Sequence, residues 1–274
     1  MSGHLVVRSR DGTSIAYDRI GDGPALILVG GAFSHRSWKG WTRLSELLAP
    51  RFTVISYDRR GRGDSGDAPE YAVEREIEDL AALVGTEGGS AHVFGMSSGG
   101  VLALRAAAAG VPIERAVVYQ PPFSVGAGGH VPPTDFAGRL DEVVASGRRG
   151  AAVSYFMREG MGAPRAFVGF LRVARPIWRN LEAVAQTLPY DLAVMDGTVH
   201  GTPLAREPWA SVAATTLVVD GGKSPASLRK AADALAERLP DAERRTLEGQ
   251  SHNVSMKVLA PVLEEFLRDR RRDA

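Results

Sequence analysis

A serine flanked by two glycines carries the clearest chemical signature in this sequence. Residues 91–100 read AHVFGMSSGG, in which Ser97 lies between Gly95 and Gly99, after a short apolar run and before an alanine-rich one. A strand, a sharp turn and a helix in that order expose the serine hydroxyl at the apex of the turn. The pattern predicts that Ser97 is a nucleophile and that the helix N-terminus directs N–H groups at a neighbouring oxyanion.

A serine hydroxyl is a poor nucleophile at neutral pH, so Ser97 needs a base beside it. Histidine has the side-chain pKa suited to that task. Of the six histidines, His252 follows the last expected strand in a polar loop, and the other five better suit structural or solvated roles. Cysteine is absent, which excludes disulfides, thiolate metal sites and a cysteine nucleophile.

Strands and helices alternate along most of the chain. After an expected hairpin over residues 4–20, strands are predicted near 24–31, 52–57, 91–96, 115–119, 215–220 and 244–247. Helices are predicted to end near 48 and to span 74–84, 101–110, 227–239 and 259–267. Uniformly apolar strands such as residues 24–29 are typical of parallel sheets covered on both faces. We therefore expect an α/β fold with a mostly parallel central sheet and helices on both faces.

The alternation stops between residues 123 and 208. This segment opens with a Gly/Pro-rich stretch and continues as short helical pieces rich in aromatic and aliphatic side chains. We expect an inserted helical cap over residues 123–208, on a core formed by residues 1–122 and 209–274. Cap side chains that face the carboxyl edge of the sheet would line a substrate cavity.

The loop over residues 58–66, DRRGRGDSG, concentrates charge directly after an apolar strand. We interpret it as a charged turn in which Asp58 and the arginines hold neighbouring loops together. A direct catalytic role for these side chains is the less favoured alternative.

Taken together, four segments resemble the α/β-hydrolase fold family, and most closely the small capped serine hydrolases common in actinomycete-type genomes. The four segments are Gly30-Gly31, 58–65, 95–99 and 249–252. The resemblance implies that Ser97 is the nucleophile and His252 the general base and acid. It also implies an oxyanion hole formed by the N–H groups of Ala32 and Ser98. The order along the chain agrees, because this family places its nucleophile before its acid and its histidine last.

The third member of the triad departs from the family pattern. Most relatives place a carboxylate where this chain has Ser224, and others place it where this chain has Gln120. Gln120 can accept a hydrogen bond from His252 through its carbonyl oxygen, but it cannot neutralise an imidazolium. Asp220 lies four positions before the usual slot and is the other candidate for this role. In serine proteases, an Asp-to-Asn change at this position lowers turnover by about 10⁴.

Two functional hypotheses follow. The first is a serine hydrolase that cleaves an ester, lactone or thioester of a small organic molecule through an acyl-enzyme on Ser97, with His252 as general base. The second is a repurposed fold that performs cyclisation, C–C bond formation or cleavage, or elimination in natural-product biosynthesis, because Gln120 and Ser224 are neutral. A ligand-binding protein without turnover is a third class, disfavoured by the intact elbow and histidine.

Composition limits which binding partners and which cellular location are expected. The net charge of +1 gives no overall reason to expect a nucleic acid or an anionic membrane as a partner. We find no metal-ligand spacing and no dinucleotide-binding motif, so no cofactor is expected. The N-terminus lacks the apolar run of a secretion signal, and no apolar stretch is long enough to span a bilayer, so a cytoplasmic protein is expected. The expected partner is a small-molecule substrate, and a homodimer is compatible with the sequence.

Overall fold

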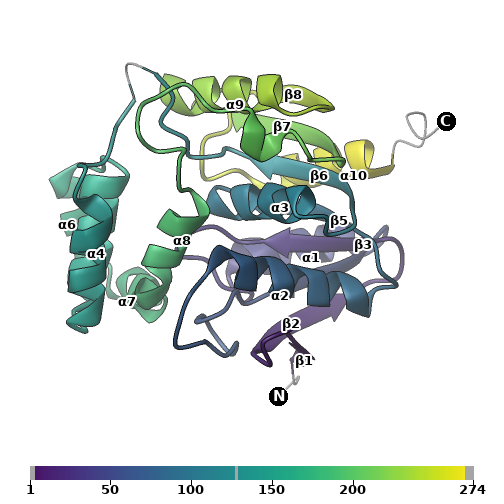
Figure 1. Ribbon diagram of the computed structural model, residues 1–274, viewed down its shortest axis with the longest axis horizontal. Coiled ribbons are helices and arrows are strands. Elements are labelled where there is room, and N and C mark those ends of the chain that lie inside the picture. The colour runs from purple at the N-terminus through teal and green to yellow at the C-terminus, as the bar shows by residue number, and fades with distance from the viewer. Residues whose placement is uncertain (1–3, 127–128, 269–274) are drawn as a thin grey trace.

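An eight-stranded sheet forms the centre of the molecule (Figure 1). The computed structural model describes residues 4–126 and 129–268. The strands lie in the order β1-β2-β4-β3-β5-β6-β7-β8. Their bounds are β1 (Leu5–Arg8), β2 (Ser14–Ile20), β3 (Ala25–Val29), β4 (Thr53–Tyr57), β5 (Ala91–Met96), β6 (Ile113–Tyr119), β7 (Thr215–Gly221) and β8 (Ala242–Leu247). β2 pairs antiparallel with both β1 and β4, and the pairings among β3 to β8 are parallel, which confirms the opening hairpin and the mostly parallel sheet.

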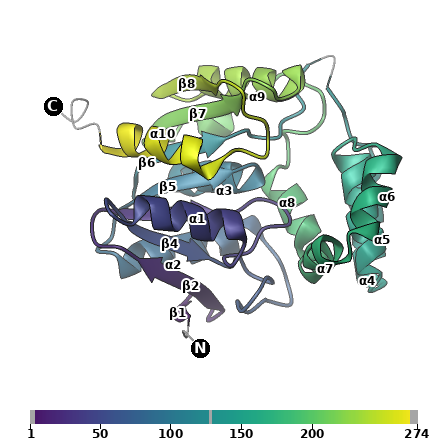
Figure 2. The same ribbon diagram turned by 180° about the vertical axis from the view of Figure 1, so that it is seen from behind.

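Helices cover both faces of this sheet (Figures 1 and 2). One face packs against α2 (Val73–Thr86), α3 (Ser98–Ala108) and α9 (Ala226–Arg238), and the other against α1 (Lys39–Leu48) and α10 (Met256–Arg268). Strand β3 supplies both cores, because Ile27 and Val29 point to the first face while Leu26 and Leu28 point to the second. This two-sided burial explains why the strand is apolar at every position.

A group of helices lies between β6 and β7. It comprises α4 (Phe136–Ala145), α5 (Arg149–Tyr155), a π-helical turn (Phe156–Gly160), α6 (Arg165–Val173), α7 (Arg175–Ala183), a 3₁₀ turn (Ala185–Thr187) and α8 (Leu188–Val194). These helices share an apolar core of their own that includes Leu140, Phe156 and Trp178. The last part of this segment packs instead against the core on the α2, α3 and α9 face of the sheet, where Val194 and Leu204 are buried. Within the described ranges, no helix is long and apolar enough to cross a membrane.

The parallel register brings distant residues to one edge of the sheet. Met96 is paired with Tyr119, and Tyr119 with Val219, so β5, β6 and β7 end side by side. Gly221 is paired with Leu247, which adds the end of β8. The residues that directly follow these strands therefore meet above the carboxyl edge, where ligands bind in α/β folds.

Candidate active site

Ser97 occupies the turn between β5 and α3 in a rarely adopted backbone conformation. Its φ is 58° and its ψ is −131°, in the region that L residues seldom enter. The turn is tight because α3 lies directly on the sheet: a Cβ added at Gly99 would lie 2.2 Å from the carbonyl oxygen of Val29. Ser97 itself lines a cavity at the carboxyl edge. This is the geometry expected of a nucleophile elbow.

His252 is held by Gln120. Its Nδ1 lies 2.7 Å from Gln120 Oε1, and Gln120 is fully buried. On the other side of the amide, Gln120 Nε2 donates to the hydroxyl of Ser224. An amide oxygen can only accept, so the proton of the neutral imidazole is on Nδ1 and Nε2 keeps a lone pair for the role of base. The two neutral positions of the triad are thus joined in one hydrogen-bond chain.

Asp220 points elsewhere. Its Oδ1 accepts a hydrogen bond from Thr246 at 2.8 Å, and its Oδ2 forms an ion pair with Arg244 at 3.3 Å. Asp220 and Thr246 are direct partners in the β7–β8 register, which explains this orientation. The expectation that Asp220 could replace the missing acid is not supported, since the contact to His252 comes from Gln120.

The imidazole of His252 lies in a neutral environment. Burial lowers the pKa of His252 below its ordinary value. The amide of Gln120 orients the ring but carries no charge that would favour the imidazolium. The arrangement therefore favours a neutral base at pH 7 and leaves the cation that forms during proton transfer without a paired carboxylate.

The two expected oxyanion donors lie beside Ser97. A Cβ added at Gly31 would lie 2.9 Å from Ser97 Cβ, so the loop after β3 touches the elbow. The N–H of Ser98 belongs to the first turn of α3. The N–H of Ala32 donates to Ser98 Oγ at 3.1 Å, so this donor already has an acceptor that an oxyanion would have to share or replace.

A buried ionic cluster supports this loop from below. The carboxylate of Asp191, on α8, accepts hydrogen bonds from Arg59 at 2.6 Å, Arg62 at 2.7 Å and the Ser98 hydroxyl at 2.7 Å. Arg59 also donates to the carbonyl of Gly30 at 3.3 Å, and Arg62 to that of Gly31 at 2.6 Å. The arginines thus tie α8 to the oxyanion loop, which confirms the structural interpretation of the charged turn.

The charges in the cluster balance. Glu76 binds the remaining side of Arg59 with contacts of 2.6 Å. Burial raises the pKa of Asp191, but Arg62 and Arg59 outweigh it and hold the pKa below its usual range. Sequence reasoning missed Asp191 and Glu76. The available signal was the arginine-rich turn itself, because buried arginines require carboxylate partners, although nothing in the sequence says which acids those are.

The cavity above Ser97 is apolar and holds about 550 Å³. Ser97 and His252 both line it. Most of its wall consists of aromatic and aliphatic side chains from the loop after β3, from α1 and from the helices between β6 and β7, among them Phe33, Trp38, Trp41, Phe156, Leu181 and Leu192. Among the residues described, no Lys or Arg lines this cavity. The volume suits a small organic molecule, and the wall suits one without charge.

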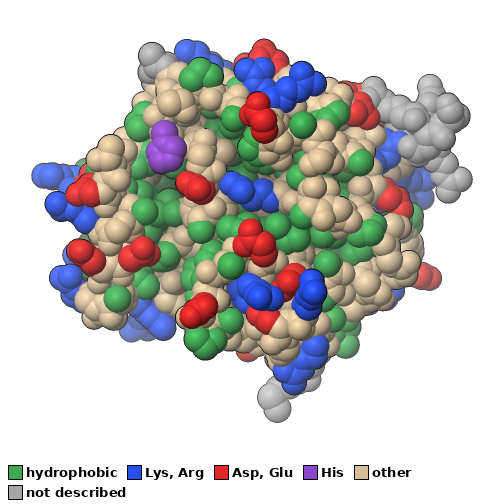
Figure 3. Space-filling view, in the orientation of Figure 1, with side chains coloured by type: hydrophobic (Ala, Val, Ile, Leu, Met, Phe, Trp, Pro, Cys, Tyr) green, Lys and Arg blue, Asp and Glu red, His purple; other side chains and the backbone are tan. Residues whose placement is uncertain are grey.

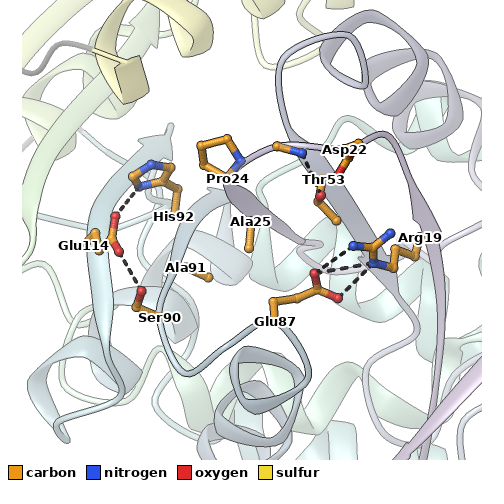
Figure 4. Close-up of a pocket in the computed structure, with 11 residues that line it drawn as sticks. Arg19, Asp22, Pro24, Ala25, Thr53, Glu87, Ser90, Ala91, His92 and Glu114 are labelled. Carbon is orange, nitrogen blue, oxygen red and sulfur yellow. Dashed lines mark hydrogen bonds and ion pairs between the residues drawn. The ribbon is translucent and has the colours of Figure 1, made fainter.

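A second, polar cavity of about 250 Å³ lies at the amino ends of the parallel strands (Figure 4). Arg19 donates to Glu87 at 3.1 Å, and Glu114 accepts a hydrogen bond from Ser90 at 2.6 Å. His92 lies 3.7 Å from Glu114. These polar side chains are thus paired with one another. The cavity lies at the edge of the sheet opposite to Ser97. The reactive residues therefore gather at the apolar cavity.

Comparison with proteins of known structure gives the same fold. An alpha/beta hydrolase from Sphaerobacter thermophilus is 53% identical and superposes with a TM-score of 0.89 over 96% of this chain and 100% of its own. The enol-lactonase from Burkholderia xenovorans shares the fold at 19% identity, with a TM-score of 0.74 over 97% of this chain and 100% of its own.

Comparison of amino-acid sequences gives further matches. Serine hydrolase BPHL of Mus musculus is 26% identical over 270 residues, which are 94% of this chain and 84% of that protein. N-formylmaleamate deformylase of Pseudomonas putida is 36% identical over 129 residues, so the match covers 45% of this chain and less than half (46%) of the deformylase. The pattern of the alpha/beta hydrolase family matches residues 25–262. With a match over most of its length, the chain belongs to the alpha/beta hydrolase family of enzymes.

Proposed function

We propose that the protein is a serine hydrolase that cleaves an ester, lactone or thioester of an uncharged, largely apolar small molecule. The observation that carries this proposal is the strained Ser97 elbow, which lines one apolar cavity together with His252. Relatives described as esterase, enol-lactonase and serine hydrolase support the reaction class.

In the proposed reaction, Ser97 Oγ attacks the carbonyl carbon and its proton passes to His252 Nε2. The carbonyl oxygen becomes an oxyanion beside the N–H groups of Ser98 and Ala32. Collapse of this intermediate expels the alcohol or thiol, which takes the proton back from His252. Water then attacks the acyl-enzyme, with His252 again accepting and returning a proton, and Ser97 is regenerated. Throughout, Gln120 keeps the Nδ1 proton in place.

The absence of charge in the substrate follows from the wall of the cavity. The described lining contains no Lys or Arg, and the carboxylate of Asp191 is already occupied by Arg59 and Arg62. A substrate carboxylate would lose its hydration on entry without gaining a cationic partner, which costs several kcal/mol. A neutral acyl group gives up no charge hydration on entry, and burial of its apolar surface stabilises the complex.

The test compares two p-nitrophenyl esters of similar length, a neutral butyrate and a succinate half-ester that carries a carboxylate. We expect kcat/KM to be about tenfold to a hundredfold higher for the neutral ester, equivalent to about 1.4–2.8 kcal/mol. The Ser97→Ala variant is the control and should hydrolyse neither ester. Equal rates on both esters would refute the substrate class, and undiminished activity in Ser97→Ala would refute the mechanism.

The neutral Gln120–Ser224 pair favours a second candidate, non-hydrolytic chemistry on a biosynthetic intermediate such as cyclisation, C–C bond formation or cleavage, or elimination. In that case His252 and the oxyanion donors would act without an acyl-enzyme. A fluorophosphonate probe separates the two, because it labels an activated serine and forms no adduct where Ser97 is not activated.

A further inference from the structure

The outer edge of the cap exposes a group of large apolar side chains. On α6, Phe167, Phe170 and Val173 are 51%, 69% and 79% exposed, and on α7, Ile177 is 51% exposed. We call these four residues the cap-edge patch. Only Val168 of α6 is buried, so the helix turns most of its apolar side chains outward. Single exposed apolar residues are ordinary, but a group on two consecutive helices in contact marks an interaction site.

The same segment is strongly basic. Residues 161–181 contain four arginines, Arg165, Arg172, Arg175 and Arg179, and no Asp, Glu or Lys. All four are exposed, and within the described part of the chain none of them makes an ion pair or a side-chain hydrogen bond. Lys and Arg side chains project from the side of the molecule where α6 and α4 lie, and Asp and Glu side chains lie beside them there (Figures 1 and 3). The net charge of +1 for the whole chain therefore hides a local charge of +4 over residues 161–181.

We propose that the α6–α7 edge docks on an anionic lipid surface, with the cap-edge patch among the acyl chains nearest the headgroups and the four arginines on the lipid phosphates. Helices that pair an apolar face with basic residues lie in the membrane interface in this way. Each basic residue near such a surface adds to the attraction. The helices lie on the bilayer rather than across it, in line with their lengths.

A second copy of the chain fits this surface less well. A closed twofold dimer sets the same patch against itself, so the four arginines of each copy would face those of the other. Residues 161–181 supply no acid to offset this repulsion. A head-to-tail contact with α4, which carries Asp141 and Glu142, would build a ring or an open chain of molecules rather than a twofold dimer.

Lipid docking goes beyond the proposed function and does not depend on it, because it is measured without turnover. The two are adjacent in space, however. Met161 lies four residues before the start of α6, is 54% exposed and also lines the cavity above Ser97. An apolar ester dissolved in the bilayer would thus meet the cavity next to the docked edge.

The test is co-sedimentation of the full chain with vesicles of phosphatidylcholine alone or mixed with phosphatidylglycerol. We expect binding to the mixed vesicles only, weakening as salt is raised. The pair Phe170→Ser and Val173→Ser should reduce binding at least about tenfold, and so should the pair Arg172→Gln and Arg175→Gln. The matched controls are Ile20→Ser and Arg51→Gln, exposed residues on the core.

All variants should keep the native circular dichroism spectrum and the native rate on a water-soluble ester, since none of the changed residues lines the cavity. The proposal is overturned if native protein ignores both vesicle types, or if the controls reduce binding as much as the patch variants do. It is also overturned if light scattering finds an oligomer that Phe170→Ser dissociates while vesicle binding is absent, because the patch would then be a self-association surface.

Discussion

Replacing Gln120 by glutamate tests the central feature of the site. The amide oxygen lies 2.7 Å from His252 Nδ1, and glutamate has the same shape, so the carboxylate would occupy the same place. The Ser224 hydroxyl, which now accepts from the amide, can rotate and donate to the new carboxylate. No hydrogen-bond partner is lost, so the variant changes the charge and little else.

The electrostatic effect can be worked out from this geometry. Two unit charges about 4 Å apart attract by about 4 kcal/mol at an effective dielectric constant of about 20, which corresponds to about three pKa units. Gln120 is fully buried, so desolvation of the new carboxylate removes part of this gain. We expect the pKa of His252 to rise by about one to two units and kcat/KM at its plateau to rise about tenfold to a hundredfold.

The assay is kcat/KM for p-nitrophenyl butyrate from about pH 5 to 8, where imidazoles titrate. In the native protein, the low pKa of His252 keeps the base deprotonated into mildly acidic solution, so activity should fall only toward the acid end. In Gln120→Glu, kcat/KM should begin to fall at a higher pH than in the native protein, because the pKa of His252 is raised. Gln120→Leu, which removes the acceptor without adding charge, should be slower than native. If Gln120→Glu leaves both rate and profile unchanged, Gln120 does not act on the catalytic base.

Further predictions concern the nucleophile, the base and the ionic cluster. Ser97→Ala should abolish fluorophosphonate labelling and lower kcat by at least about a thousandfold, while circular dichroism stays native. His252→Ala should lower kcat by a similar factor but keep substrate binding, measured as an unchanged inhibition constant for a neutral product alcohol. Asp191→Asn should lower the free energy of unfolding in urea by about 3–5 kcal/mol, because it leaves two buried arginines without their shared carboxylate. Since the pKa of Asp191 is held below its usual range, that difference should persist above about pH 4 and shrink as the pH falls through the lowered pKa.

Much of the fold could be predicted from local patterns. The apolar run of β3 and the glycines around Ser97 report directly on burial and close packing, so strands and elbow were found within a few residues of their bounds. The ends of helices were predicted less closely than their existence. Helix α10 begins at Met256, three residues before the predicted start, and includes Pro261. Short elements at chain reversals depend on tertiary contacts that periodicity does not record.

Within the candidate site, the sequence motifs predict Ser97 and His252 as the reacting groups, and both residues line one cavity. The sequence leaves both Gln120 and Asp220 open as the partner of His252. The register of β7 with β8, which turns Asp220 to Thr246, and the contact of Gln120 with His252 separate the two. Asp191 was missed because it lies on α8, a seven-residue helix without a motif. Its partners, Arg59 and Arg62, are more than a hundred residues away along the chain.

The contact between Gln120 and Ser224 also bears on how such sites diverge. These two positions are 104 residues apart in sequence and follow different strands, yet their side chains share one hydrogen bond next to the same imidazole. An acid introduced at either position would thus reach the neighbourhood of His252 without rearrangement of the sheet. A single substitution at either position would therefore place a carboxylate in the hydrogen-bond chain that reaches His252, from the end of β6 or from the end of β7.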